Sequence, residues 1–406
     1  MTRVAVSITI DRMHPELHRI IERIRAASAD ATPLGIRGGG TKDFYGNTVR
    51  RDAESREVLD TRPLSGIVSY EPSELVVTAR AGTTLAELEA LLAGQGQCLP
   101  FEPPHFGGDG GGDGKSATVG GMVAAGLSGP ARASVGAVRD YVLGAMLVDG
   151  RGEALSFGGQ VMKNVAGYDV SRVLAGSLGT LGVIAEVSLK VLPVAPAEAT
   201  LRFDCTQAEA LDLLNGWGGR PLPLNASCWV AEQADRQSGT LYLRLRGAVA
   251  AVEAACGHLG GQVQPDAAAD WALCREQRLP WFVDGSASGK RDLWRVSVPQ
   301  TAPVLAVDGM PLIEWHGGQR WYFMPPDGDA GAALRRAAVA AGGHATLFRP
   351  ATTGTGSPLC AGARFTALSP ALERIHRALK REFDPAGIFE PGRLLVCDED
   401  AERAQR

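Results

Sequence analysis

The stretch DGGGDGKSATVGG, residues 109–121, contains the residue types of a phosphate-binding loop. Glycines let a backbone approach phosphate oxygens closely, and a Gly-Lys-Ser triplet would add a cation and a hydroxyl. The mononucleotide pattern requires Gly, four residues, then Gly-Lys-Ser/Thr, but Asp109 stands at the first position. The preceding CLPFEPPHFGG contains three prolines that break the buried strand such a loop follows, and Asp109 and Asp113 would repel phosphate. The sequence therefore argues against an ATPase.

Two more glycine-rich segments, 38–40 and 176–182, lie in the same half of the chain. These two segments and 107–121 each lie beside a predicted strand. Three such segments together favour one large ligand held by backbone amides. A Rossmann site is the weaker interpretation. GGGTKDFYG lacks the Gly-x-Gly-x-x-Gly spacing, and GSLGTLG follows a helix-like run instead of a strand.

Local signals predict the elements that must position these segments. A helix begins at Pro15, and its Leu17, Ile20, Ile21 and Ile24 share one face. Residues 64–82 form two strands around a Glu-Pro-Ser turn, and a capping box of Thr84 and Glu87 begins a helix over 85–93. Further strands are predicted within 141–153 and 175–194.

The pattern changes after about residue 197. Strand-like and helix-like segments follow in the order β-α-β-β-α, which predicts a separate antiparallel α+β domain. A second group of elements extends to about residue 349. The last helix has Ser369 as N-cap and Pro370 at its first position.

Composition narrows the class of protein. The 406 residues allow two or three domains, and a net charge of −4 without a basic run does not suggest nucleic-acid or anionic-membrane binding. Seven scattered cysteines without a Cys-x-x-Cys pair indicate reduced thiols and exclude a cysteine-ligated iron–sulfur cluster within this chain. No signal peptide or membrane span is predicted, so a cytoplasmic protein is expected.

Several segments carry a family resemblance. The chain resembles FAD-linked oxidases of the vanillyl-alcohol oxidase type, and among them most of all the FAD-binding E subunits of bacterial glycolate oxidase (glycolate dehydrogenase). The resemblance covers 33–194 and 370–397 closely, and 342–351 less specifically. The motifs that carry it are IRGGGTK (36–42) and the segments 100–129, 135–153, 163–193 and 379–394.

The resemblance implies an α+β fold with three parts. A PCMH-type FAD-binding domain of two subdomains would span 1–195. An α+β, ferredoxin-like cap domain would span 196–350, and a C-terminal segment, 351–406, would return to complete the FAD site.

The resemblance also implies the residues that contact the cofactor. The loop Arg37, Gly38, Gly39, Gly40, Thr41 and Lys42 would hold the pyrophosphate. A second loop with Thr118, Gly120 and Gly121 would close over the ribityl chain, and 109–116 would be an insertion that merely imitates a phosphate loop. The remaining contacts would be Asp140, Val183 and Ile184 near the ribose and adenine, and Lys163, Asn164, Tyr168 and Arg393 near the isoalloxazine. FAD would be non-covalent, since residues 35–60 contain no His or Cys.

Departures from the family limit what the resemblance implies about substrate. Related 2-hydroxy-acid dehydrogenases carry a histidine-rich metal site in the late cap, but here only His344 lies in that region, so no metal is expected. Leu178 and Glu390 replace the Glu and Asn common in relatives. Arg295, Arg349 and Arg393 are candidates for binding a carboxylate, and no catalytic residue is assigned.

Three hypotheses about function remain open. The first is an FAD-binding subunit of a multi-subunit glycolate oxidase that works with a catalytic flavin subunit and an iron–sulfur subunit, and that meets the membrane only through the complex. The second is a self-sufficient FAD-dependent dehydrogenase of a 2-hydroxy acid, of the D-lactate type. The third is a structural subunit that has lost its flavin, against which the intact glycine loops argue.

Overall fold

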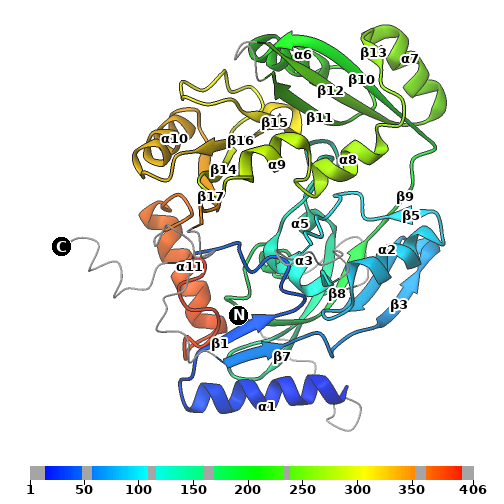
Figure 1. Ribbon diagram of the computed structural model, residues 1–406. Helices are drawn as coiled ribbons and strands as arrows, with labels where there is room; N and C mark the ends of the chain where they lie inside the picture. Colours follow the sequence, from blue (N-terminus) through cyan, green and yellow to red (C-terminus); the bar gives the residue numbers. More distant parts are fainter. Residues whose placement is uncertain are drawn as a thin grey trace.

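Two antiparallel sheets dominate the computed structural model (Figure 1). It describes residues 14–47, 57–107, 116–159, 169–232, 238–352 and 363–395. The first half of the chain builds a five-stranded sheet in the order β3-β4-β8-β6-β7. Its strands are β3 (Ile67–Glu71), β4 (Val76–Arg80), β6 (Val142–Val148), β7 (Ala154–Gly158) and β8 (Val183–Lys190).

Two small strand pairs flank this sheet. β1 (Leu34–Arg37) pairs in parallel with β2 (Glu57–Asp60), and β5 (Gln97–Cys98) pairs with β9 (Leu192–Pro193). The helices of this half are α1 (Pro15–Ala29), α2 (Leu85–Ala93), α3 (Val119–Ala125), α4 (Arg132–Val135), α5 (Val138–Tyr141) and the 3₁₀ turns η3 (Pro72–Glu74) and η4 (Ser171–Leu174).

The middle of the chain builds an eight-stranded sheet in the order β13-β10-β12-β11-β15-β16-β14-β17. The strands are β10 (Ala197–Thr206), β11 (Leu224–Ala231), β12 (Ser238–Gly247), β13 (Gln262–Val263), β14 (Asp292–Ser297), β15 (Leu312–Glu314), β16 (Gln319–Met324) and β17 (His344–Arg349). The helices are α6 (Gln207–Gly218), α7 (Val249–Leu259), α8 (Ala268–Arg275), α9 (Pro280–Ser286), η5 (Trp315–Gly317) and α10 (Asp329–Ala340). The predicted β-α-β-β-α order is thus observed in β10, α6, β11, β12 and α7.

Local sequence signals correctly placed several helix starts. Thr84 Oγ1 accepts the Glu87 amide at the start of α2, and Ser369 Oγ accepts the Leu372 amide at the start of α11 (Pro370–Phe383). A side-chain acceptor at the N-cap satisfies an amide that has no partner within the helix. In α1 the predicted apolar face is buried against β1 and the five-stranded sheet.

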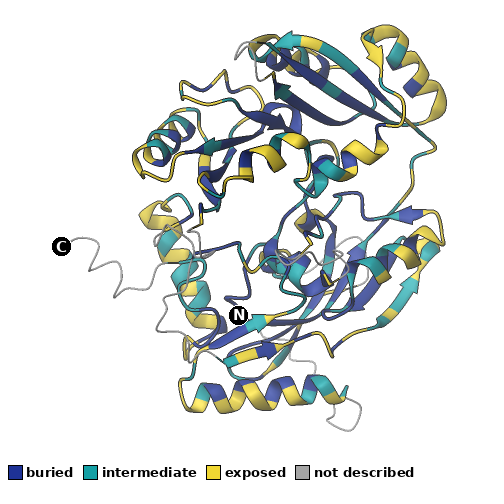
Figure 2. Cartoon of the chain, viewed as in Figure 1, coloured by how far each residue is buried: buried dark blue, intermediate teal, exposed yellow. Residues whose placement is uncertain are grey.

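The C-terminal segment returns to the first half of the chain. The amide of Leu34 donates to Ile388 O at 2.7 Å, the amide of Glu390 donates to Leu34 O at 3.1 Å, and Leu34 and Phe389 form a parallel bridge. Ile388 and Phe389 are buried with residues of α1 and β1. Figure 2 shows buried residues only in part of α1, whose remaining residues are exposed. A chain segment from beyond residue 380 is therefore part of the wall beside β1.

Candidate functional site

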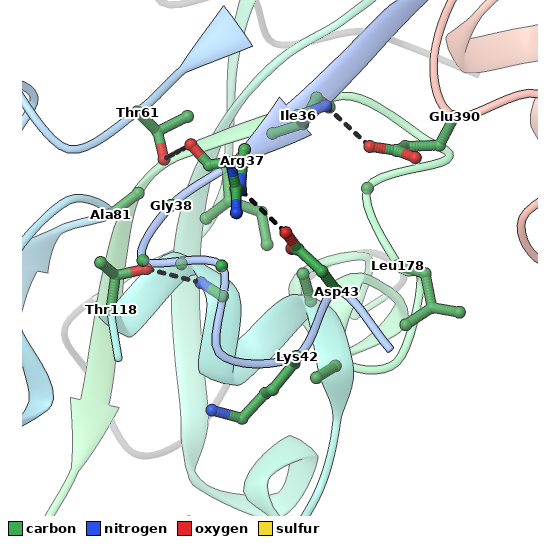
Figure 3. Close-up of a pocket in the computed structure, with 18 of the residues that line it drawn as sticks. Ile36, Arg37, Gly38, Lys42, Asp43, Thr61, Ala81, Thr118, Leu178 and Glu390 are labelled. Atoms are coloured by element: carbon green, nitrogen blue, oxygen red, sulfur yellow. Dashed lines mark hydrogen bonds and ion pairs between the residues drawn. The ribbon is translucent and has the colours of Figure 1, made fainter. Parts of the chain in front are cut away.

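A cavity of about 740 Å³, open at its mouth, lies at the carboxyl end of β1 (Figure 3). Most of its lining comes from four parts of the chain: the loop after β1, the first turns of α3, the 178–184 segment that leads into β8, and the returning 390–393 turn. Thr61 and Ala81, which follow β2 and β4, complete it. The lining residues are Ile36, Arg37, Gly38, Gly39, Gly40, Thr41, Lys42, Asp43, Thr61, Ala81, Thr118, Gly120, Gly121, Ala124, Ala125, Leu178, Gly179, Gly182, Ile184, Glu390 and Arg393.

The residues of the loop 38–42 all line this cavity. Within the described parts of the chain, none of the N–H groups from Gly38 through Lys42 donates a hydrogen bond to another residue. Gly40 has a φ of +73°, which turns the loop back on itself and which L side chains rarely adopt. Successive amides in such a turn form a concave site for an anion.

Gly38 and Gly39 are required by close packing against the segment that precedes α3. A Cβ on Gly39 would lie 1.6 Å from Ser116 O, and a Cβ on Gly38 would lie 2.3 Å from Thr118 Oγ1. The glycine loop and the 116–118 segment thus press directly on each other. This contact fixes one wall of the cavity relative to the other.

Thr118 is the N-cap of α3, and its Oγ1 accepts the Gly121 amide at 3.3 Å. The Gly120 amide donates to Ala81 O at 2.8 Å, and a Cβ at Gly120 would lie 2.7 Å from the Ala81 Cβ. Glycine at this position therefore lets α3 lie against the end of β4. The helix start is brought to the cavity with its positive dipole end toward the glycine loop.

Charged side chains around the loop are compensated. Arg37 Nε lies 2.8 Å from Asp43 Oδ2 across the loop. Lys42 Nζ donates to His105 O at 3.3 Å and to Thr41 Oγ1 at 3.2 Å. Burial lowers the pKa of Lys42 to about 8, and the Glu276 carboxylate opposes that shift. An anion in the cavity would favour the charged form of Lys42.

The contact that Glu390 makes explains why this residue departs from the family pattern. Its carboxylate is buried, and Oε1 accepts the amide of Ile36 at 2.7 Å (Figure 3). The backbone of Glu390 has a φ of +44° and that of Leu178 a φ of +52°, so both lie in the left-handed region. Glu390 therefore fastens the returning segment to the strand that leads into the glycine loop.

Arg393 supports the loop from the far side. Its Nη2 donates to the carbonyls of Lys42, Asp43 and Tyr45, at 3.4, 3.3 and 2.9 Å. The other two carboxylate candidates are also engaged. Arg295 Nη2 donates to the Tyr45 hydroxyl at 2.9 Å, and the Arg349 guanidinium lies 3.6 Å from the centre of the Phe44 ring. All three arginines are thus held in contacts within the protein.

The structure gathers most of the sequence-predicted cofactor residues around one cavity. Those that line it are Arg37, Gly38, Gly39, Gly40, Thr41, Lys42, Thr118, Gly120, Gly121, Ile184 and Arg393. Val183 instead packs into the core with Leu34 and Ile388, and Asp140 is exposed and accepts the Ala137 amide at 2.8 Å. Lys163, Asn164 and Tyr168 lie outside the described residues. The contacts of all these residues with a cofactor stay predictions.

Several lining residues were not predicted from the sequence. Thr61, Ala81 and Ala124 reach the cavity through strand pairing and helix packing that leave no local motif, whereas Gly182 belongs to the glycine-rich segment 176–182. Glu390 and Leu178 did carry a signal, because both depart from the family pattern. In the described part of the chain, no group of three or more His, Cys, Asp or Glu could hold a metal ion. No described helix is long and apolar enough to cross a membrane.

Comparisons with known proteins agree with this geometry. Residues 16–158 match the family model of an FAD binding domain. A solved structure of alkyldihydroxyacetonephosphate synthase shares the fold, with a TM-score of 0.64 and 18% identity over 93% of this chain and 76% of that one. The chain therefore has a mixed α+β fold that resembles this structure and contains an FAD binding domain.

Three curated relatives refine the comparison. Glycolate oxidase subunit GlcD of Bacillus subtilis is 28% identical over 48% of this chain and 38% of its own length. D-lactate dehydrogenase of Archaeoglobus fulgidus is 34% identical over 42% of this chain and 35% of its own length. Glycolate oxidase subunit GlcE of Escherichia coli is 42% identical over 93% of this chain and 97% of its own length. The chain therefore belongs to the GlcE family of FAD-binding glycolate oxidase subunits.

Proposed function

We propose that this chain binds FAD without a covalent bond and takes part, within a multi-subunit glycolate oxidase, in the oxidation of glycolate to glyoxylate. The electrons pass to an acceptor other than NAD. The observation that carries the proposal is the row of amides from Gly38 to Lys42 that have no partner among the described residues and that line one cavity with the start of α3. Such an arrangement suits the pyrophosphate of a dinucleotide.

The residues present fit FAD. The amides of 38–42 would hold the pyrophosphate, Lys42 would supply a positive charge, and Ile184 would contribute an apolar wall. Glu390 and Arg393 would act on the cofactor indirectly, by fixing β1 and the loop. When bound, FAD supplies the acceptor for a hydride equivalent.

Non-covalent binding is supported by the chemistry of the cavity wall. Among the described residues that line it, there is no His or Cys that could bond to a flavin carbon. Cys98, the thiol nearest in sequence to the loop, lies in β5, and burial raises its pKa. That environment disfavours the reactive thiolate.

A division of labour between subunits is supported by the polar groups around the cavity. Oxidation of a 2-hydroxy acid requires a base for the hydroxyl proton and a cation for the carboxylate. The described residues that line the cavity include no His, and the carboxylates of Asp43 and Glu390 already interact with Arg37 and with the Ile36 amide. We therefore assign the substrate site to a catalytic flavin subunit related to GlcD, with an iron–sulfur subunit as the onward electron carrier.

The division of the chain into 1–195, 196–350 and 351–406 is part of the proposal. It is supported by strand pairing: among the described strands, β10 through β17 pair only with one another, and 388–390 bond to β1. In this proposal, 1–195 is the two-subdomain FAD domain, 196–350 is the ferredoxin-like cap, and 351–406 completes the FAD site.

The purified chain provides the direct test. We expect a flavin absorption spectrum with about one FAD per chain, and we expect acid precipitation to release all the yellow colour into the supernatant. A colourless chain that takes up no added FAD would favour the structural-subunit hypothesis. Flavin that stays in the acid pellet would contradict non-covalent binding.

A further inference from the structure

A carboxylate from the proposed cap, that of Glu276, binds the backbone of the segment that follows β5 in the first part of the chain. Glu276 is the C-cap residue of α8, and Figure 1 shows α8 on the side of the eight-stranded sheet that faces that first part. The carboxylate accepts the amide of Phe106 at 2.7 Å and that of His105 at 3.1 Å. Hydrogen bonds to a charged acceptor are stronger than neutral ones. Glu276 therefore fixes two successive backbone amides.

The peptide group between His105 and Phe106 connects this carboxylate to Lys42. Its N–H, which belongs to Phe106, donates to Glu276, and its carbonyl, which belongs to His105, accepts from Lys42 Nζ at 3.3 Å. The cation thus lies at the negative end of the peptide dipole and the carboxylate at the positive end. Hydrogen bonds connected in this way polarise and strengthen one another. Lys42 lines the cofactor cavity, whereas Glu276 is not among the described residues that line it.

This connecting peptide is held in an uncommon conformation. Phe106 has a φ of +50°, which residues other than glycine rarely adopt. Its ring is buried 5.7 Å from the ring of Phe44, and Lys42 Nζ lies 5.7 Å from its centre. Arg275 Nε donates to Glu276 Oε1 at 2.7 Å and so fixes the carboxylate from its other side. Because an uncommon backbone conformation persists only where neighbouring contacts hold it, Glu276 helps to maintain the position of the 105–106 peptide.

Burial and the Glu276 carboxylate act on Lys42 in opposite directions. Burial lowers the pKa of Lys42 to about 8, and the Glu276 carboxylate raises it. Other charged groups face this region from the loop itself and from the elements packed against it: Arg37, Asp43, Glu89, His105, Arg275, Arg349 and Arg393. Glu276 is the charge among them that counteracts the effect of burial on Lys42.

We propose that Glu276 is a positioning residue for the cofactor, which holds Lys42 at the cavity through the 105–106 peptide and supports the positive charge that the pyrophosphate meets. This inference rests on the proposed function, because it takes the bound anion to be FAD. It makes FAD binding in the first part of the chain depend on a residue of the proposed cap.

Removal of one negative charge tests the proposal. The variant is Glu276→Gln in the full chain, because the amide oxygen of Gln can still accept a backbone N–H. Glu276→Asp keeps the charge, and the matched control Glu253→Gln removes the same charge from an exposed position on α7. FAD affinity is measured by calorimetry on both sides of pH 8. The acetylation of Lys42 by acetic anhydride is followed over the same pH range in FAD-depleted protein, by peptide mass spectrometry.

We expect the FAD affinity of Glu276→Gln to begin its fall at a lower pH than that of the wild type, because the variant loses the charge that raises the Lys42 pKa. Each affinity is compared with the same variant's value at about pH 6, which removes the direct repulsion between Glu276 and the anion. On this scale the affinity at pH 8 should drop by up to about tenfold for each pH unit of displacement. The midpoint of Lys42 acetylation should move to lower pH as well.

The control variants should separate charge from structure. Glu276→Asp and Glu253→Gln should keep the wild-type pH dependence in both measurements. In the Lys42→Met background, Glu276→Gln should no longer alter the pH dependence of FAD affinity.

Two results would overturn the inference and leave the proposed function standing. One is a Glu276→Gln protein with the wild-type pH dependence in both measurements. The other is a loss of FAD affinity that is equal at every pH and equally large in the Lys42→Met background, because Glu276 would then act only by fastening α8. A wild-type chain that takes up no FAD would refute the proposed function, and with it the role of Glu276 toward the cofactor. The acetylation profile, measured without FAD, distinguishes that failure from a Glu276 that has no effect on Lys42.

Discussion

Gly39→Ala is the substitution that examines the glycine loop most sharply. A methyl group at this position would lie 1.6 Å from Ser116 O and 2.4 Å from the Ser116 carbonyl carbon. Both atoms belong to backbone, so no side-chain rotation can relieve the contact. Gly39 has no positive φ, and the expected effect is therefore purely steric.

The magnitude follows from the size of the clash. Ordinary carbon contacts are about 3.5–4.0 Å, so the loop and the 116–118 segment must separate by about 2 Å. That movement takes the amides of the loop away from the pyrophosphate. A hydrogen bond to a charged group contributes about 1.5–3 kcal/mol, so loss of even one such bond weakens FAD binding by about 10- to 150-fold. Overpacking costs a further ~1–3 kcal/mol of folding stability.

The assay is titration of the FAD-depleted protein with FAD, followed by flavin fluorescence, with circular dichroism to verify the fold. Gly216→Ala is the matched control, because nothing lies within 4 Å of its added methyl and the residue is in α6, away from the cavity. We expect at least a tenfold loss of affinity for Gly39→Ala and none for the control. Wild-type affinity in a folded Gly39→Ala protein would refute the loop assignment.

Three further predictions concern residues around the same cavity. Gly38→Ala alone should weaken FAD binding, because its methyl group would clash with Thr118 Oγ1. Adding Thr118→Ala should partly restore the binding. If the losses of FAD affinity from the two single variants simply add in the double variant, this clash is not the cause. FAD affinity should fall by up to about tenfold per pH unit above pH 8, because charged Lys42 favours the bound anion and its pKa of about 8 in the empty site rises on binding. Measured by calorimetry, the FAD affinity of Lys42→Met should not change with pH in this range. A pH dependence in Lys42→Met equal to that of the wild type would exclude Lys42 as its cause. Glu390→Ala should lower the free energy of unfolding by about 1–3 kcal/mol, because it leaves the Ile36 amide without its acceptor. Glu390→Gln should retain the hydrogen bond. Equal melting curves for both variants would show that the hydrogen bond to the Ile36 amide does not stabilise the fold.

Elements with local signals could be predicted from the sequence. The starts of α2 and α11 follow from Thr84 and Ser369, because an N-cap acts within four residues. The two strands around the Glu-Pro-Ser turn are observed as β3 and β4, joined by η3. These signals need no information from the rest of the chain.

Contacts between distant segments could not be predicted in the same way. The bond between Ile36 and Glu390 joins residues 354 positions apart, and no local pattern announces it. The order of the eight-stranded sheet likewise depends on which strands meet in space. The family resemblance supplied the return of the C-terminal segment, but not the carboxylate that fastens it.

The glycine loop shows the limit of motif reasoning in another way. The sequence indicates that Gly38 and Gly39 let the backbone approach phosphate. In the structure, an added Cβ at either residue would point at the 116–118 segment. The glycines thus serve the assembly of two loops, and the approach to an anion follows from that assembly.

We propose above all that this chain is a flavoprotein subunit whose catalytic activity depends on its partners. The most direct measurement is reduction of an artificial electron acceptor by glycolate, with the FAD-loaded chain alone and with the complex reconstituted from all three subunits. We expect slow turnover by the chain alone and restored activity in the complex. Rapid glycolate oxidation by the chain alone would contradict the claim and would favour a self-sufficient dehydrogenase.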